Sequence, residues 1–432
     1  MLGKIDCNYQ WRARGKLSRG AGKMSFLCSG RRRWGMTAII IIGSMLTALP
    51  LSALDVIHGP WLSHPSNGEV AINWTTDIPA GGMVEYRKTG TTEWQQRCDT
   101  FAGQIFVDRT AHHLLLDRLE PGAEYEYRIV LLDGESCREV RPTPDRGGTF
   151  RVFSPADRTT RVWVSADLQN TTVHRRAEPR LLHLLPLDQC DFAVVLGDSF
   201  NAVNDLEKEF YQGVMTPFFA AGANHVPVLL VRGNHEWRGR RSADFVRAFG
   251  HPATHHCYYM LRRGPDVFIV LDSGEDKADK KAGMRNDSDA YMAAQRRWLE
   301  QAVRSDACKN ARYRIVFIHN ATYAMAEDYA AARVRRLLDG LLGGHAPEQR
   351  IDLMLAGHEH CYVRGLPGQK ALSFYRPGKR PAAEHWTSGR EFRYPVIIQD
   401  GPGYGGEDAS VSDLTLSDAG LELKVFSLSG HL

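Results

Sequence analysis

The 432-residue sequence has no internal repeat, no low-complexity segment and little net charge beyond its first residues. Without a repeat, solenoid and fibrous architectures are excluded. Residues 1–33 carry nine Lys or Arg and one acidic residue, which accounts for the formal net charge of +4. The rest of the chain has 45 basic and 49 acidic residues, a balance of −4. The folded part therefore lacks a basic footprint, and we expect no nucleic-acid partner.

Long apolar stretches are also scarce. One uncharged stretch, residues 34–54, follows the basic triplet Arg31-Arg32-Arg33, and Leu51-Ser52-Ala53 supplies the small residues of a cleavage site. This order predicts an export signal over residues 1–53 and a secreted, periplasmic or otherwise extracytoplasmic protein. An uncleaved anchor at residues 34–54 is the alternative, because the stretch is long enough to span a bilayer. Such an anchor is the one membrane attachment that we expect.

Eight cysteines are compatible with an oxidising compartment but do not require one. Cys98 and Cys137 fall in one predicted domain and can pair there. Four later cysteines allow three pairings or can all be free buried thiols: Cys190, Cys257, Cys308 and Cys361.

Residues 54–155 show no helical periodicity. Val70, Ile72 and Trp74 alternate with other residues in the pattern of a half-buried strand, and turn residues recur at the spacing of a β-sandwich. We therefore predict a small all-β domain over residues 54–155.

From residue 156 to residue 432 the pattern changes to strand, loop and helix, which predicts an α/β layered domain. Residues 365–395 are rich in Gly, Pro and charge and predict a long loop, whereas residues 414–426 predict a closing hairpin. Helices are predicted at residues 179–185, 206–219, 291–303 and 330–342.

Five short apolar runs in this second domain each end at a residue that can bind a hard metal ion. In an open sheet, parallel strands deliver such residues to one edge, outside their carboxyl ends. The groups are carboxylate, amide and imidazole, with no thiolate, which favours a hydrolytic Mn, Fe, Zn or Mg site over a structural zinc site. The runs are residues 162–164, 192–196, 228–231, 315–318 and 353–355, and the residues that follow them are Asp167, Asp198, Asn234, His319 and the pair His358 and His360.

Hydrolysis of a phosphate ester requires neutralised phosphoryl oxygens, a nucleophile and a proton for the leaving oxygen. Two metal ions about 4 Å apart supply the first two. We expect Asp198 to bridge the ions and His235, next to Asn234, to steady the phosphate or protonate the leaving group. The first ion is assigned Asp167, Gln169, Asp198 and His360, and the second Asp198, Asn234, His319 and His358.

These residues resemble the motifs of calcineurin-like metallophosphoesterases, and in particular of the purple acid phosphatases that have an N-terminal fibronectin type III-like domain. Leu119, Pro121, Tyr125 and Tyr127 resemble the corner of such a module. The resemblance implies an αββα sandwich, a dinuclear centre of Fe, Mn or Zn, and phosphomonoesterase or phosphodiesterase activity. The matching segments are Asp167-Leu168-Gln169, Gly197-Asp198, Gly233-Asn234-His235-Glu236, His319 with Tyr323, and residues 357–364.

Two positions depart from the family pattern. Gln169 stands where the family usually has His, and Asn201 stands where purple acid phosphatases have Tyr. A Gln carbonyl is a weaker, neutral ligand, so we expect a more exchangeable first metal and no tyrosinate-to-iron colour.

The sequence thus predicts an exported, two-domain enzyme that hydrolyses a small phosphate monoester by attack of a metal-bound hydroxide on phosphorus. Two alternatives stay open. One is a phosphodiesterase or nucleotidase of the same fold. The other is a binding protein that uses the fibronectin-like module and has lost catalysis, which the missing His and Tyr motivate.

Overall fold

The computed structural model describes residues 54–136, 138–169, 172–277, 286–323, 329–375, 384–387, 391–401 and 409–428. The predicted signal or anchor at residues 1–53 and Cys137 lie outside the described residues. Among the described cysteines, Cys98, Cys190, Cys257 and Cys308 are free thiols. No helix within the ranges above is long and apolar enough to cross a membrane.

The described residues before 156 form strands, as predicted, in an antiparallel sheet built around one long strand. The first half of β2 (Glu69–Lys88) pairs with β1 (Val56–Ser66) and β6 (Arg109–Leu116), and its second half pairs with β3 (Gln95–Cys98) and β7 (Glu124–Asp133). Ile72 and Trp74 are fully buried, as their alternation predicts. The shorter strands β8 (Glu139–Val140) and β9 (Gly147–Arg151) pair with β7, whereas β4 (Thr100–Phe101) and β5 (Gln104–Ile105) form a separate two-stranded sheet. The boundary at residue 155 and the fibronectin-like character remain predictions.

The α/β part contains two sheets that face each other across an apolar core. Alternate residues of each central strand point into different layers. Val162 and Val164 lie in the core between the sheets, whereas Trp163 packs against the helices on the outer face. Because both faces are covered, these strands are continuous apolar runs. The first sheet has the order β12 (Val228–Leu230), β11 (Phe192–Val195), β10 (Thr160–Ser165), β21 (Ser410–Ser417), β22 (Gly420–Ser427).

The second sheet continues the same logic. Ile315 and Phe317 of β15 face the core between the sheets, and Val316 packs against the helices on the outer face of this sheet. β14, β15, β16 and β20 run parallel, so their carboxyl ends lie at one edge. The order is β13 (Tyr259–Arg263), β14 (Asp266–Val270), β15 (Arg314–Phe317), β16 (Leu353–Ala356), β20 (Val396–Ile398), β17 (Tyr362–Gly365), β18 (Ala371–Tyr375), β19 (Glu384–Thr387).

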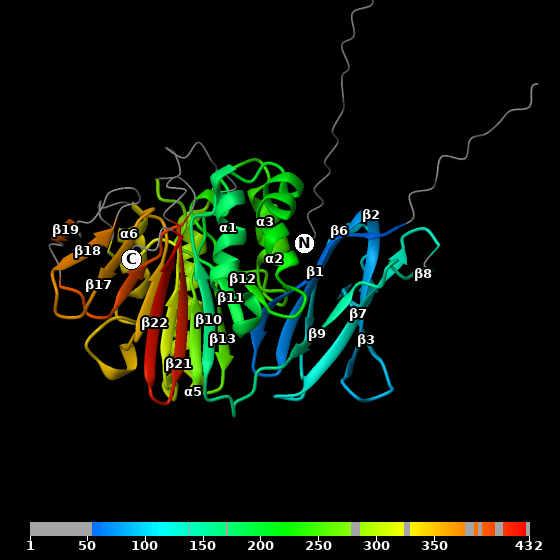
Figure 1. Cartoon of the computed structure of the whole chain (residues 1–432), viewed down its shortest axis with the longest axis horizontal. Coiled ribbons are helices and arrows are strands. Elements are labelled where there is room, and N and C mark those ends of the chain that lie inside the picture. Colours follow the sequence, from blue (N-terminus) through cyan, green and yellow to red (C-terminus); the bar gives the residue numbers. More distant parts are fainter. Residues whose placement is uncertain are drawn as a thin grey trace, which may run out of the picture. The chain divides into compact units, whose positions relative to one another are not determined.

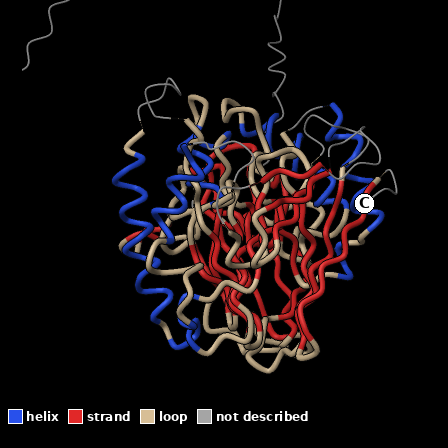
Figure 2. Tube along the Cα trace, turned by 90° about the vertical axis from the view of Figure 1, so that its left-hand side faces the viewer, coloured by secondary structure: helices blue, strands red, loops and turns tan. Residues whose placement is uncertain are grey.

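Helices cover the outer faces of both sheets (Figures 1 and 2). The layer on the first sheet contains α1 (Thr172–Leu184), α2 (Thr216–Ala220) and α3 (Ser242–Phe249). The layer on the second contains α4 (Ser288–Arg304), α5 (Asp306–Lys309) and α6 (Tyr329–Leu338). The mixed α/β fold of the prediction is therefore confirmed. Short 3₁₀ turns lie at Leu187–Gln189, His235–Trp237 and Pro347–Gln349.

The predicted helix at residues 206–219 is confirmed, as a π-helix over Glu207–Met215 that leads directly into α2. Two other local predictions were wrong. The first predicted helix begins seven residues earlier, at Thr172, because Pro179 lies inside α1 rather than at its start. The predicted loop at 365–395 contains strands β18 and β19, which extend the open edge of β17. Its Gly, Pro and charged residues hid two short strands.

Candidate metal centre

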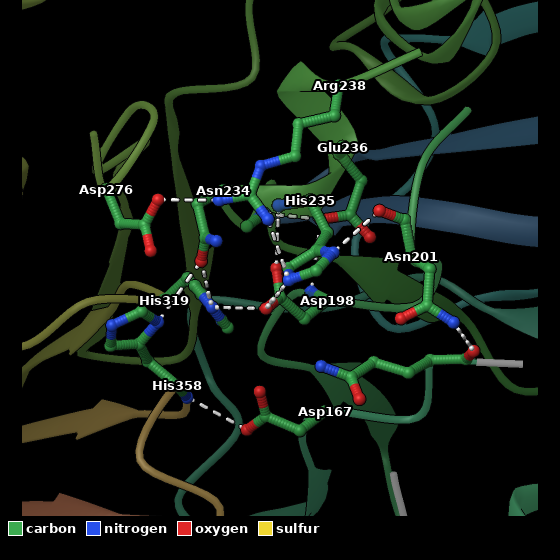
Figure 3. Close-up of polar contacts among 12 residues, drawn as sticks. Asp167, Asp198, Asn201, Asn234, His235, Glu236, Arg238, Asp276, His319 and His358 are labelled. Carbon is green, nitrogen blue, oxygen red and sulfur yellow. Dashed lines mark hydrogen bonds and ion pairs between the residues drawn. The ribbon is translucent and has the colours of Figure 1, made fainter. Parts of the chain in front are cut away.

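Four strand ends meet at one buried point. Asp198 follows β11, Asn234 follows β12, His319 follows β15 and His358 follows β16. Ligand atoms of Asp198, His319 and His358 all lie within 4.8 Å of one another (Figure 3). His319 Nε2 is 3.0 Å from Asn234 Oδ1 and 3.1 Å from Asp198 Oδ2. His358 Nδ1 is 3.1 Å from the same Asn234 oxygen. The structure therefore brings together all four residues predicted for the second ion.

The donor atoms at this point require a positive charge between them. His319 Nδ1 lies 2.7 Å from the Leu196 carbonyl, so Nδ1 carries the hydrogen and a neutral ring presents a lone pair at Nε2. That lone pair faces oxygens of Asn234 and Asp198. Burial opposes a charged imidazole here, but Asp198 overrides it and raises the pKa of His319 to about 10. A metal ion satisfies the same demand with all three donors as ligands, so the residues fit a bound cation.

A second group of donors lies on the other side of Asp198. Asp167 is fully buried and its Oδ2 accepts the His358 backbone N–H at 2.9 Å. Within the described chain, Asp167 Oδ1 and Gln169 Oε1 are buried oxygens without a hydrogen-bond partner. His360 Nε2 lies 3.9 Å from Asp167 Oδ1 and 3.3 Å from Gln169 Nε2. Two buried oxygens without donors fit a second cation. The individual ligand roles remain predictions.

The backbone is unusual at these positions. Nine described non-glycine residues have a positive φ, and five of them are predicted ligands. Side chains rarely adopt this conformation, and its local cost is typical of functional sites. The five are Asp167 (52°), Gln169 (51°), Asp198 (52°), His358 (82°) and His360 (49°).

Glycines allow the ligand loops to approach each other. A Cβ at Gly233 would lie 2.3 Å from Asp198 Oδ1, and a Cβ at Gly197 would lie 2.7 Å from His319 Nδ1. Both contacts are closer than any side chain permits. The glycines before Asp198 and Asn234 are therefore needed for packing as well as for the turn.

Glu236 holds the loops together and received no role from the sequence. It is fully buried, and its carboxylate accepts backbone N–H groups of Gly233 (2.8 Å), Asp198 (3.0 Å) and Ser199 (2.6 Å). Burial and the Asp198 charge raise the pKa of Glu236 to about 7, while the N–H donors oppose that shift. Its place in the segment Gly233-Asn234-His235-Glu236, two residues after the predicted ligand Asn234, was the one sequence signal that could have indicated this role.

His235 lies at the open side of the centre. Its backbone N–H donates to Asp198 Oδ1 at 2.9 Å, and its Nδ1 lies 2.6 Å from the Asn201 carbonyl. Its Nε2 is 3.8 Å from Asp198 Oδ2. Burial lowers the pKa of His235, and Asp198 acts in the opposite sense. The ring is therefore placed to contact a group bound at Asp198.

Known proteins resemble this chain in sequence and in fold. Residues 160–362 match the family of calcineurin-like phosphoesterases. The chain contains a calcineurin-like metallophosphoesterase domain. It is 26% identical to acid phosphatase type 7 of Mus musculus over 346 residues, 72% of this chain and 71% of that protein. It is 22% identical to purple acid phosphatase 4 of Arabidopsis thaliana over 245 residues, 52% of this chain and 69% of that protein.

The fold of this metallophosphoesterase matches that of purple acid phosphatase PPD1 from yellow lupin (Lupinus luteus) seeds. The TM-score is 0.59 at 16% identity, over 86% of this chain and 72% of that chain. The predicted family resemblance and the predicted class, a hydrolase of phosphoric esters, are confirmed. The family also implies a dinuclear metal centre.

The two departures of this metallophosphoesterase from the family pattern lie side by side. Asn201 Nδ2 donates to the Gln169 carbonyl at 3.2 Å, and the Asn201 carbonyl faces the His235 ring. Asn201 thus ties the first ligand loop to His235. Where the resemblance led us to expect a tyrosine ligand, Asn201 instead contacts two neighbouring residues.

Proposed function

We propose that this metallophosphoesterase is an exported phosphatase that hydrolyses small phosphate monoesters at a dinuclear centre. The observation that carries the proposal is the placement of Asp198 between two donor groups, with His319 Nε2 at 3.1 Å on one side. The relatives in mouse and Arabidopsis are named acid phosphatases, which supports monoesters as the substrate class.

The donor set supports Fe, Mn or Zn at both positions, because it combines imidazole nitrogens with carboxylate and amide oxygens. Asp198 would hold both ions. When bound, the two ions neutralise the phosphoryl oxygens and lower the pKa of the attacking water. The first ion would take Asp167, Gln169 and His360 as its other ligands, and the second Asn234, His319 and His358.

Side chains around the centre orient the substrate. The Asn201 carbonyl accepts from His235 Nδ1–H and fixes the plane of the ring. The edge of the ring that carries Nε2 faces the space beside Asp198, where the leaving oxygen of a bound ester would lie. We assign His235 one of two roles: it contacts the phosphoryl group, or it donates a proton to the leaving oxygen.

Turnover of p-nitrophenyl phosphate across Fe, Mn, Zn and Mg tests the proposal. The His358→Ala variant should lose at least about 10²-fold in kcat with every metal, because a ligand is removed. Circular dichroism that matches the wild type shows that the variant is folded. Undiminished turnover by folded His358→Ala would refute the assigned centre.

Export rests on the sequence of residues 1–53 alone. Expression of the full chain followed by N-terminal sequencing of the extracytoplasmic protein tests it. A mature protein that begins near residue 54 supports cleavage, and an intact protein in the membrane fraction supports the anchor. Retention of all protein in the cytosol contradicts both forms of the proposal.

A further inference from the structure

Arg238 lies beside the metal centre and divides its guanidinium between two sides (Figure 3). Its Nε and Nη2 donate to the two oxygens of Glu275 at 2.9 and 2.6 Å, and Nη2 also donates to Asp276 Oδ1 at 2.6 Å. Its Nη1 lies 3.0 Å from His235 Nε2. The edge of the guanidinium that carries Nε and Nη2 is thus held by carboxylates, and Nη1 points toward His235.

The Nη1 group has a hydrogen to spare. A guanidinium only donates, so His235 Nε2, while it carries no proton of its own, accepts one of the two Nη1 hydrogens. Within the described chain this is the one hydrogen bond of Nη1. His235 Nε2 is itself 3.8 Å from Asp198 Oδ2. Arg238 Nη1 is thus separated from Asp198 by the His235 ring alone, and its second N–H has no hydrogen-bond acceptor among the described residues.

Glu275 fixes this orientation. It is fully buried, and its ion-pair partner is Arg238, with two oxygens bound by the planar fork. The Arg238 side chain is 19% exposed, so solvent and small ligands still reach it. Asp276 supports the same nitrogen and is 20% exposed. An arginine that only pinned the loop after β14 would not need Nη1 turned toward His235.

We propose that Arg238 Nη1 binds the nonbridging phosphoryl oxygen that a monoester has and a diester lacks, and thereby favours monoesters over diesters. Glu275 and Asp276 act as positioning residues that hold Arg238 in place. A monoester dianion has one more anionic oxygen than a diester, and a charge-assisted bond to that oxygen benefits the monoester alone. This inference rests on the proposed phosphatase function and assigns its selectivity to one side chain.

The test compares two substrates with the same leaving group, p-nitrophenyl phosphate and methyl p-nitrophenyl phosphate. In Arg238→Met, kcat/KM for the monoester should fall about 10- to 100-fold, and for the diester less than about 3-fold. The monoester-to-diester ratio therefore falls about 10-fold or more. Arg240→Met removes an exposed positive charge from the same loop and should leave the ratio unchanged. Equal losses on both substrates, or no loss, would overturn the role of Arg238.

A second variant guards against misfolding. Arg238→Met alone leaves the buried Glu275 without its cation, so the double variant with Glu275→Gln removes both charges together. It should show the same fall in ratio with normal metal content. A double variant that keeps the wild-type ratio contradicts the inference. The monoester-to-diester ratio of the wild type is a separate test. A wild-type enzyme that prefers the diester contradicts the proposed monoesterase, even if Arg238→Met lowers the ratio further.

Discussion

His319 Nε2 lies 3.1 Å from Asp198 Oδ2, and both residues are buried almost completely. The opposite nitrogen of the ring is held by the Leu196 carbonyl at 2.7 Å, so the ring cannot turn away without breaking that bond. A buried imidazole lone pair that faces a carboxylate needs a proton or a metal ion between them. The pair therefore marks the place that we propose for one ion.

Replacement of His319 should remove that ion. His319→Ala deletes a ligand and leaves Asp198 buried without it, so we expect kcat to fall on the order of 10³-fold or more. Steady-state kinetics with p-nitrophenyl phosphate and added metal checks this. His345→Ala is the control, because His345 is exposed. A folded His319→Ala variant whose kcat is within about 3-fold of the wild-type value would contradict the assignment of His319 as a metal ligand.

Glu236 should matter for stability as much as for activity. Glu236→Ala leaves the N–H groups of Gly233, Asp198 and Ser199 buried without an acceptor. Each such loss costs about 1–3 kcal/mol, so the free energy of unfolding should fall by several kcal/mol. Urea denaturation measures it. Glu236→Gln keeps an acceptor oxygen and should lose about half as much or less. Equal stability of Glu236→Ala and wild type contradicts this role.

Two histidines, the buried His64 and the half-buried His251, should make the fold sensitive to acid. The rings of His64 and His251 meet edge to face, with centroids 5.4 Å apart. Burial lowers the pKa of His251 to about 4, with His255 and His256 adding to the effect, and burial lowers the pKa of His64 as well. Both histidines are neutral in the folded protein near pH 7, and both titrate near pH 6.5 in the unfolded chain. The free energy of unfolding is therefore highest above pH 6.5 and decreases as the pH falls toward 4, because the unfolded chain takes up protons first.

The His251→Gln variant tests this linkage. Between pH 7 and pH 4.5 it should lose less stability than wild type, by on the order of 2 kcal/mol, because one titrating group is removed. Denaturation curves at both values measure the difference. An exposed control, His345→Gln, should follow the wild type. Parallel loss in wild type and His251→Gln would show that His251 does not contribute.

Iron-loaded protein should lack an intense visible charge-transfer band. Asn201 stands where the family resemblance leads us to expect the tyrosine ligand, and its side chain donates to the backbone carbonyl of Gln169 instead. An absorption spectrum of protein loaded with iron under air checks this directly. A purple protein would show that another phenolate reaches the iron.

Much of the centre was predictable because its signals are local. Asp198 and His319 each follow a short apolar strand, and parallel strands must place their ends together. Their neighbours, Asn234 and His358, follow by the same reasoning. The α/β layers followed from the alternation of strand and helix. These predictions depend only on period and order along the chain.

Other features depend on contacts that no local pattern encodes. Arg238 meets Glu275 across 37 residues, and nothing near either residue signals the pairing. The positive φ at Gln169 is set by the loop it closes, since its N–H bonds to the Asp198 carbonyl. The π-helix Glu207–Met215 was predicted as a helix, but its composition does not indicate the π form. Tertiary context decides all three.

Metal stoichiometry of wild type and Asp198→Ala tests the central claim most directly. Plasma mass spectrometry on dialysed protein, with unfolding curves as a check of structure, provides the measurement. We expect about two bound ions in wild type, and fewer than one in Asp198→Ala, since the lost carboxylate would contact both ions. A folded Asp198→Ala protein that keeps both ions would contradict the account.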